Sequence, residues 1–259
     1  MVKSVIFNSL WNDSIEFFKK NFMMLFLIGV LFYFLPRVYV GYNNLIPEFE
    51  FIGELSIPQI RNMLLAVAST SLFASLLFVS VAYSMKSKKK NASAKDVING
   101  ASKYYLKAIG LSIVLAIALF LIFLVVAVPL LLLLGILIVE NQQLISFFVV
   151  LAAIPALYFL IRWIFSTCIL VFEDSFIIGS VKKSTKIVKG RWWDVFFKIV
   201  LIGLVMGLVN YILLLGIILF EGAGYTNNLF NLISTNLLST FTTLFVSIFL
   251  INYYLTLKK

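Results

Sequence analysis

Residues 108–139 read AIGLSIVLAIALFLIFLVVAVPLLLLLGILIV and contain no charged side chain. An α-helix rises about 1.5 Å per residue and the hydrocarbon core of a bilayer is about 30 Å thick, so this stretch can cross a membrane. Pro129 lies inside it and predicts a kink or a break, because proline removes a backbone donor and clashes with the preceding turn. The stretch indicates an integral membrane protein.

The composition of the whole chain agrees with this interpretation. Of its 259 residues, 62% are hydrophobic and 12% are charged, and the mean hydropathy is +1.07. Ordinary soluble domains contain roughly 45–50% apolar and 25% charged residues. The chain has no histidine, one cysteine (Cys168) and 11 carboxylates, which argues against histidine-based catalysis, zinc sites and disulfide frameworks. We therefore expect a non-enzymatic protein with no catalytic, cofactor or metal site.

Hydropathy predicts an all-α, polytopic fold with six transmembrane helices in a single integral membrane domain, residues 1–259. The predicted spans are residues 22–39, 60–85, 108–139, 144–172, 195–220 and 232–257. A count of five or seven follows instead if the third span is re-entrant or split at Pro129.

Charge placement favours six spans and gives them an orientation. With both termini in the cytoplasm, the inner segments hold 18 of the 21 lysines and arginines, and the outer loops hold only Arg37 and Arg61. The inner face then carries about +12 and the outer face about −3. An anionic lipid leaflet accounts for such a surface without nucleic acid. The use of 17 lysines against 4 arginines, with abundant isoleucine and phenylalanine, suggests an AT-rich prokaryotic genome, and hence a bacterial or archaeal plasma membrane.

Three segments between the spans are amphipathic at helical spacing, and each directly precedes an outward-going span. Their apolar stripes follow an i, i+4, i+7, i+11 pattern. The stripes are Phe7, Trp11, Ser14 and Phe18; Val97, Ala101, Tyr104 and Ala108; and Ile177, Val181, Ser184 and Val188. The pattern predicts three cytoplasmic interfacial helices with their lysines toward anionic headgroups. It is consistent with three repeats, residues 1–90, 91–173 and 174–259, or with amphipathic connectors that arose without duplication.

Residues 173–193 read EDSFIIGSVKKSTKIVKGRWW. The segment resembles the signature of a prokaryotic family of integral membrane domains, related to the membrane domain of glycerophosphodiester phosphodiesterases and also found as stand-alone six-span proteins. The matching positions are Glu173, Ser180, Lys182, Lys183, Ser184, Lys189, Gly190, Trp192 and Trp193. The resemblance implies a membrane topology and a lipid-facing role. It does not carry over hydrolysis, since the catalytic domain with its histidines and metal-binding carboxylates is absent.

Two groups of charged residues within this segment are candidate sites. The candidate headgroup contacts are Lys182, Lys183, Lys186, Lys189 and Arg191. These residues either set the membrane topology or bind the phosphate of anionic lipids. Glu173 and Asp174 precede the third amphipathic helix, where they either cap that helix or form a structural ion pair with another repeat.

Arg162 is the one charge predicted well inside a span, about ten residues before its cytoplasmic end. It either snorkels to the interface or faces polar partners. Helix rise places Asn252, Ser80 and Tyr83 at a similar depth, so these residues and Arg162 form a candidate polar cluster.

Two functions follow from these features. The first is a scaffold or accessory protein that contacts anionic lipid through its basic helices, with a protein partner or a second copy as further candidate partners. The alternative is a small carrier or lipid-handling transporter with a pathway near Arg162. A cavity beside Arg162 would favour the carrier, and a tightly packed bundle would favour the scaffold.

Overall fold

The computed structural model describes residues 7–42, 57–87, 93–138, 142–222 and 228–258, which are helical apart from short turns. The elements are α1 (Phe7–Lys20), α2 (Phe22–Gly29), the π-helical turn η1 (Val30–Phe34), α3 (Leu35–Tyr42), α4 (Ile57–Ser87), α5 (Ala94–Ile138), α6 (Gln142–Trp163), α7 (Ser166–Phe172), α8 (Ile177–Val188), α9 (Trp192–Gly222) and α10 (Asn228–Lys258). The all-α prediction is therefore confirmed for the described residues.

Five stretches of helix within the described residues are long and apolar enough to cross a membrane. They are Phe22–Val40, Ala94–Leu130, Leu151–Phe172, Trp192–Ile217 and Leu232–Lys258. The predicted second span, residues 60–85, lies within the 31-residue helix α4. For the first turns of α4 the structure describes the backbone but not the side chains. A multi-pass membrane protein is supported, and the count of six stays a prediction.

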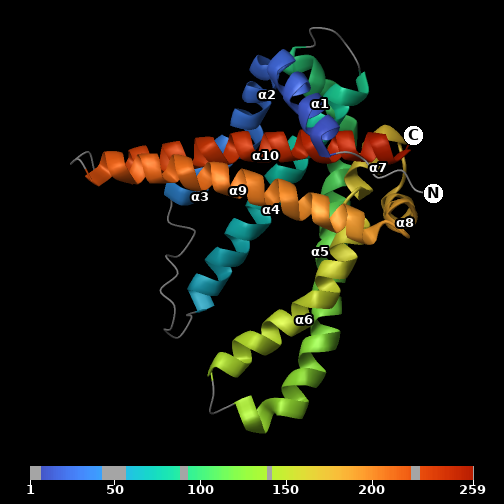
Figure 1. The fold of residues 1–259 in the computed structure, drawn as a ribbon, viewed down its shortest axis with the longest axis vertical. Helices are drawn as coiled ribbons and strands as arrows, with labels where there is room; N and C mark the ends of the chain where they lie inside the picture. The colour runs from blue at the N-terminus through green and yellow to red at the C-terminus, as the bar shows by residue number, and fades with distance from the viewer. Residues whose placement is uncertain (1–6, 43–56, 88–92, 139–141, 223–227, 259) are drawn as a thin grey trace.

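Helix α5 begins earlier than the predicted third span, and it continues through Pro129. It runs without interruption for 45 residues, so the second predicted interfacial helix is the first part of this long helix and not a separate element. The helix starts after Ser93, whose hydroxyl accepts a hydrogen bond from the Asp96 N–H at 3.2 Å and donates one to the Asp96 carboxylate at 2.8 Å. Pro129 does not end the helix, although the far part of α5 turns aside (Figure 1).

The first predicted span contains a widened turn just before Pro36. The Leu35 N–H donates to the Val30 carbonyl, five residues back, and this makes η1 a π-helical turn. Proline has no N–H and its ring crowds the carbonyl four residues earlier, so a wider turn relieves the clash while the helix continues.

The fourth predicted span is two helices instead of one. Helix α6 ends at Trp163 and α7 begins at Ser166, with the Ile164 N–H bonded to the Ile161 carbonyl at a long 3.5 Å. Helix α7 then lies within the protein, since Cys168, Ile169, Leu170 and Val171 are fully buried.

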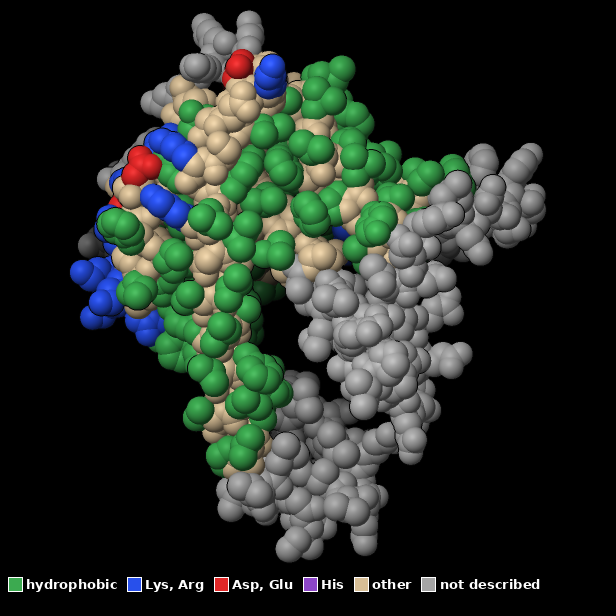
Figure 2. Space-filling view, turned by 180° about the vertical axis from the view of Figure 1, so that it is seen from behind, with side chains coloured by type: hydrophobic (Ala, Val, Ile, Leu, Met, Phe, Trp, Pro, Cys, Tyr) green, Lys and Arg blue, Asp and Glu red, His purple; other side chains and the backbone are tan. Residues whose placement is uncertain are grey.

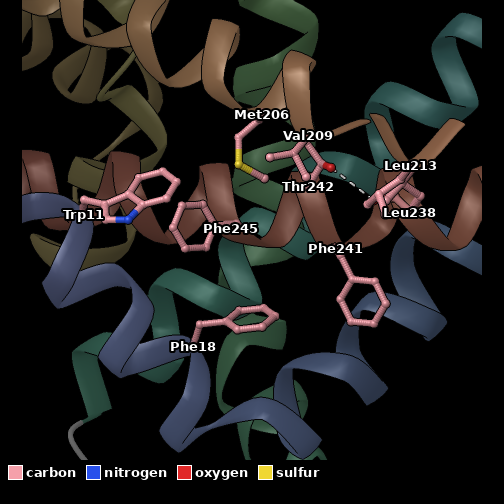
Figure 3. Close-up of a pocket in the computed structure, with 9 residues that line it drawn as sticks. All are labelled: Trp11, Phe18, Met206, Val209, Leu213, Leu238, Phe241, Thr242 and Phe245. Atoms are coloured by element: carbon pink, nitrogen blue, oxygen red, sulfur yellow. Dashed lines mark hydrogen bonds between the residues drawn. The ribbon is translucent and has the colours of Figure 1, made fainter. Parts of the chain in front are cut away.

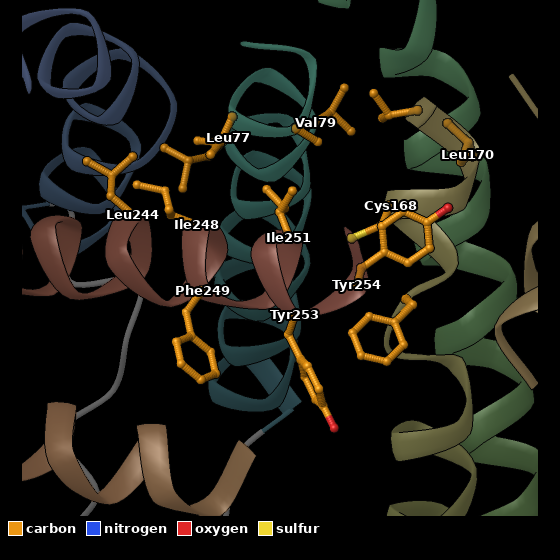
Figure 4. Packing of buried hydrophobic residues seen from close by; sticks show 14 of the residues in the cluster. Leu77, Val79, Cys168, Leu170, Leu244, Ile248, Phe249, Ile251, Tyr253 and Tyr254 are labelled. Carbon is orange, nitrogen blue, oxygen red and sulfur yellow. The ribbon is translucent and has the colours of Figure 1, made fainter. Parts of the chain in front are cut away.

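The helical hairpins spread outward from one end of the molecule. Helices α9 and α10 run side by side, while α5 and α6 point steeply away from them (Figure 1). Near the origin of the spread, α10 packs against α4 and α7 in a buried cluster that includes Leu77, Ile251, Tyr254 and Cys168 (Figure 4). This cluster is the core of the described fold.

The surface separates by chemistry. Hydrophobic side chains cover most of the coloured face in Figure 2, and the lysines and arginines gather toward one end. Large apolar side chains such as Val125 and Leu204 are 72% and 66% exposed, which suits contact with lipid tails. The region rich in lysine and arginine is called the basic end. It is formed by the last turns of α4 and α10, the α7–α8 turn and α8.

Candidate functional site

Glu173 and Asp174 lie in the turn between α7 and α8, where the helices of the basic end meet. The Glu173 N–H donates to the Ile169 carbonyl at 2.9 Å and closes the last turn of α7. Asp174 follows with a φ of 49°, in the left-handed region that Asp and Asn tolerate better than most side chains. The resulting change of backbone direction lets the neighbouring carboxylates reach different helices.

The Glu173 carboxylate joins α7 to α8 and α10. One oxygen lies 2.6 Å from Nζ of Lys183 on α8. The other lies 2.9 Å from Nζ of Lys258 and accepts a hydrogen bond from the Tyr254 hydroxyl at 3.1 Å, both on α10. Only 20% of the Glu173 side chain is exposed, so these contacts are partly shielded from solvent.

The Asp174 carboxylate reaches α4 and α5 instead. It lies 3.0 Å from Nζ of Lys86 and 4.0 Å from Nζ of Lys103. Lys86 also donates to the Tyr104 hydroxyl at 2.9 Å and to the Val171 carbonyl at 2.6 Å. Tyr104 and Lys86 hold the pKa of the Asp174 carboxyl below its usual value. Burial lowers the pKa of Lys86, but its hydrogen bonds outweigh burial and raise the pKa overall.

Adjacent carboxylates thus connect α4, α5, α8 and α10 to the end of α7. We call this group the inner ion-pair cluster: Glu173, Asp174, Lys86, Lys103, Lys183 and Lys258. Neither acid caps α8, whose N-cap residue is Phe176 and makes no side-chain capping hydrogen bond. Glu173 and Asp174 form ion pairs with lysines of other helices instead.

The stability of the protein is expected to fall in acid because of Glu173. Hydrogen bonding to Lys183, followed by that to Lys258 and Tyr254, outweighs burial and lowers the Glu173 pKa from 4.5 to about 2. A lowered pKa stabilises the fold fully above pH 4.5, and this contribution is lost as the pH falls toward 2. We expect the apparent melting temperature in detergent to drop over this interval, with a smaller drop in Glu173→Gln. Parallel curves for the two proteins would contradict this assignment.

A further carboxylate, in the first turn of α9, is also paired. Asp194 forms an i, i+4 ion pair with Lys198 on α9 and accepts a hydrogen bond from the Tyr253 hydroxyl of α10 at 2.7 Å. Sequence reasoning did not single out this pair, although the four-residue spacing of acid and lysine on one helix was a usable signal. It joins the start of α9 to the end of α10.

The third residue of each amphipathic stripe is buried, and its hydroxyl forms a hydrogen bond with another helix. These residues are Ser14, Tyr104 and Ser184. Ser14 accepts a hydrogen bond from the Asn252 amide of α10 at 3.1 Å, and Tyr104 accepts one from Lys86 of α4. The stripes therefore face protein in the structure. A hydroxyl at an apolar position was the sequence signal for these contacts.

Ser184 bridges the break between α6 and α7. Its hydroxyl donates to the Arg162 carbonyl at 2.8 Å and accepts from the Phe165 N–H at 3.2 Å. These backbone groups lie at the interruption of the helical hydrogen-bond pattern, where each needs a partner from outside the helix. The serine of the quoted segment therefore docks α8 onto the broken span.

Each residue of the predicted polar cluster contacts a residue outside that cluster. Arg162 donates a hydrogen bond to the Tyr158 hydroxyl at 3.3 Å, and Ser80 is hydrogen-bonded to the Tyr105 hydroxyl at 2.8 Å. Asn252 bonds to Ser14, and the rings of Tyr83 and Tyr104 lie with their centroids 6.2 Å apart. The prediction assumed one straight helix up to residue 172. Because α6 ends at Trp163, Arg162 lies in its last turn, where a cation is favoured by the helix dipole.

The predicted headgroup residues lie on or just after α8. The helix buries Ser180, Ser184 and Val188 on one side. Lys182, Lys183, Lys186 and Lys189 are exposed, and Arg191 is half-buried in the turn before α9. The bulky apolar side chains Phe176, Ile178 and Trp193, which flank the lysines at either end of α8, are 81%, 66% and 64% exposed.

Potential metal ligands do not gather in the described part of the chain, and the cavity described below lies away from Arg162. No group of three or more potential metal ligands occurs within the described residues. One apolar cavity lies between α1, α9 and α10, and none of the residues lining it belongs to the predicted polar cluster. Comparisons with protein families, with curated proteins and with solved structures find no match to this chain.

Proposed function

We propose that the protein is a non-enzymatic scaffold or accessory protein of a prokaryotic plasma membrane that binds anionic lipid headgroups through α8. The supporting observation is that the carboxylates around α8 are already paired, whereas most of its lysines are not. Among the described residues, ion pairs within 4 Å use Lys86, Lys103, Lys183, Lys198 and Lys258. None of these pairs involves Lys182, Lys186 or Lys189, so the charges of these exposed lysines are available to a partner.

The apolar neighbours of these lysines support a lipid as that partner. Exposed Phe176 and Ile178 lie at the start of α8, and exposed Trp193 lies just after its end. Basic residues alternating with large apolar side chains are typical of helices at a membrane interface, where rings enter the headgroup region and lysines meet phosphates.

Replacing Lys182, Lys186 and Lys189 with glutamine tests the proposal. We expect the preference for anionic over zwitterionic lipid to fall by about tenfold, because each basic group near an anionic surface adds to the attraction. Native mass spectrometry of protein extracted from mixed-lipid vesicles measures this preference. Replacing the same residues with arginine keeps the charge and serves as the control. An unchanged preference in the glutamine variant would refute headgroup binding by α8.

The carrier alternative stays a prediction. Arg162 is half-buried beside Tyr158, with its guanidinium carbon 5.4 Å from the ring centre. This arrangement resembles a residue at an interface more than the wall of a pathway.

A further inference from the structure

A groove crosses the face of α10 between α9 and α1, with a volume of about 420 Å³ (Figure 3). Trp11 and Phe18 enter it from α1, Phe241 and Phe245 from α10, and Met206 and Val209 from α9. A volume of this size is within the range of sites for small ligands, which is roughly 300–1,000 Å³. The groove lies away from α8 and is therefore distinct from the surface in the proposed function.

The lining of the groove is almost entirely apolar and favours an apolar ligand. Thr242 is the one hydroxyl residue among the residues that line the groove, and its Oγ1 is already used. It lies 2.9 Å from the Asn210 side-chain oxygen and 3.1 Å from the Leu238 carbonyl of its own helix. The indole N–H of Trp11 is the remaining polar side-chain group among these residues. A groove with so few hydrogen-bonding groups holds water poorly and favours a hydrocarbon occupant.

The surroundings of the groove identify the source of that hydrocarbon. Helices α9 and α10 both contain candidate membrane spans, and the outer side of α9 exposes Leu204, Leu208 and Ile212 by 66%, 60% and 57%. Val209 of the groove wall is itself 40% exposed, so the groove is continuous with this lipid-facing surface. An alkyl chain from the bilayer reaches it without crossing water.

The helix at the edge of the groove bears charges of both signs. Asp13, Glu16, Lys19 and Lys20 are all exposed on α1, and Lys19 directly follows Phe18 of the groove. Balanced charges of this kind complement a headgroup that contains a phosphate and an amine, and they give no preference for a net anion. We propose that the groove holds one acyl chain of a zwitterionic phospholipid, with the headgroup beside the charged side of α1.

The test uses Trp11, which lines the groove, as a reporter. The protein is reconstituted in vesicles of phosphatidylethanolamine and phosphatidylcholine with brominated acyl chains, which quench nearby tryptophans. The Trp11 signal is the difference between the wild-type protein and Trp11→Phe. Val209→Phe fills the groove and is expected to reduce quenching of Trp11 at least about twofold, because overpacking excludes the chain. Leu208→Phe, on the exposed side of the same helix, is the matched control and is expected to leave quenching unchanged.

Two outcomes would overturn the proposal. Equal Trp11 quenching in the wild type and in Val209→Phe would show that Trp11 meets only bulk lipid. Stronger quenching by brominated fatty acid than by the phospholipids would show that the occupant is a free acid. The glutamine variant of Lys182, Lys186 and Lys189 is expected to keep normal Trp11 quenching, so failure of the groove and failure of headgroup binding by α8 are distinguishable.

Discussion

Glu173→Ala is expected to lower the apparent melting temperature in detergent by about 5–10 °C, which corresponds to about 2–3 kcal/mol for a chain of this size. The substitution leaves Lys183 and Lys258 without their carboxylate and removes the acceptor of the Tyr254 hydroxyl. Lys183 and Lys258 are about half exposed, so water replaces part of what each ammonium loses. The larger loss arises at the phenol, because a partly buried donor without a partner is unfavourable.

Glu16→Gln provides the control for this experiment, because Glu16 is an exposed carboxylate on α1. We expect it to change the melting temperature by less than about 2 °C, as is usual for exposed substitutions. Scans at one fixed heating rate make the comparison valid even if unfolding is irreversible. Equal effects of the two variants would show that the inner ion-pair cluster does not hold the helices together.

The membrane-embedded character of the chain could be predicted because it depends on local sequence. For a long uncharged apolar run such as residues 108–139, the lipid bilayer is the favourable environment. The rise per residue of a helix then shows that the run is long enough to cross the bilayer. The stripe Val97, Ala101, Tyr104 and Ala108 was similarly readable, and all of these residues are buried. The stripe could not show whether its apolar face packs against lipid or against protein, since a lipid surface and a protein core favour the same pattern.

The break in the fourth span was not predictable from its own residues. The stretch from Ile161 to Ser166 contains no proline or glycine, and Arg162 is its one charged residue. The partner that makes the break tolerable, Ser184, lies on a different helix and is brought into place only by the tertiary fold. The predicted depth of Arg162 was counted along an unbroken helix, whereas Arg162 lies in the last turn of α6, next to the break.

Ser184→Ala is expected to destabilise the protein by about 1–3 kcal/mol, because it removes the hydroxyl that serves the Phe165 N–H and the Arg162 carbonyl together. Alanine leaves nearly the same shape, so lost hydrogen bonding accounts for the change. The expected signs are a lower melting temperature and faster hydrogen exchange at the Phe165 amide, because α8 then docks less firmly on the break.

Ser180→Ala is the matched control on the same helix. Ser180 is fully buried like Ser184, but its hydroxyl donates only to the Ile177 carbonyl one turn earlier in α8, at 2.7 Å. Alanine is the better helix former, so this variant is expected to be neutral or slightly stabilising. If both substitutions lower the melting temperature equally, the loss reflects a general need for serine on the buried side of α8. If only Ser184→Ala does so, the hydroxyl at the helix break is what docks α8 onto the bundle.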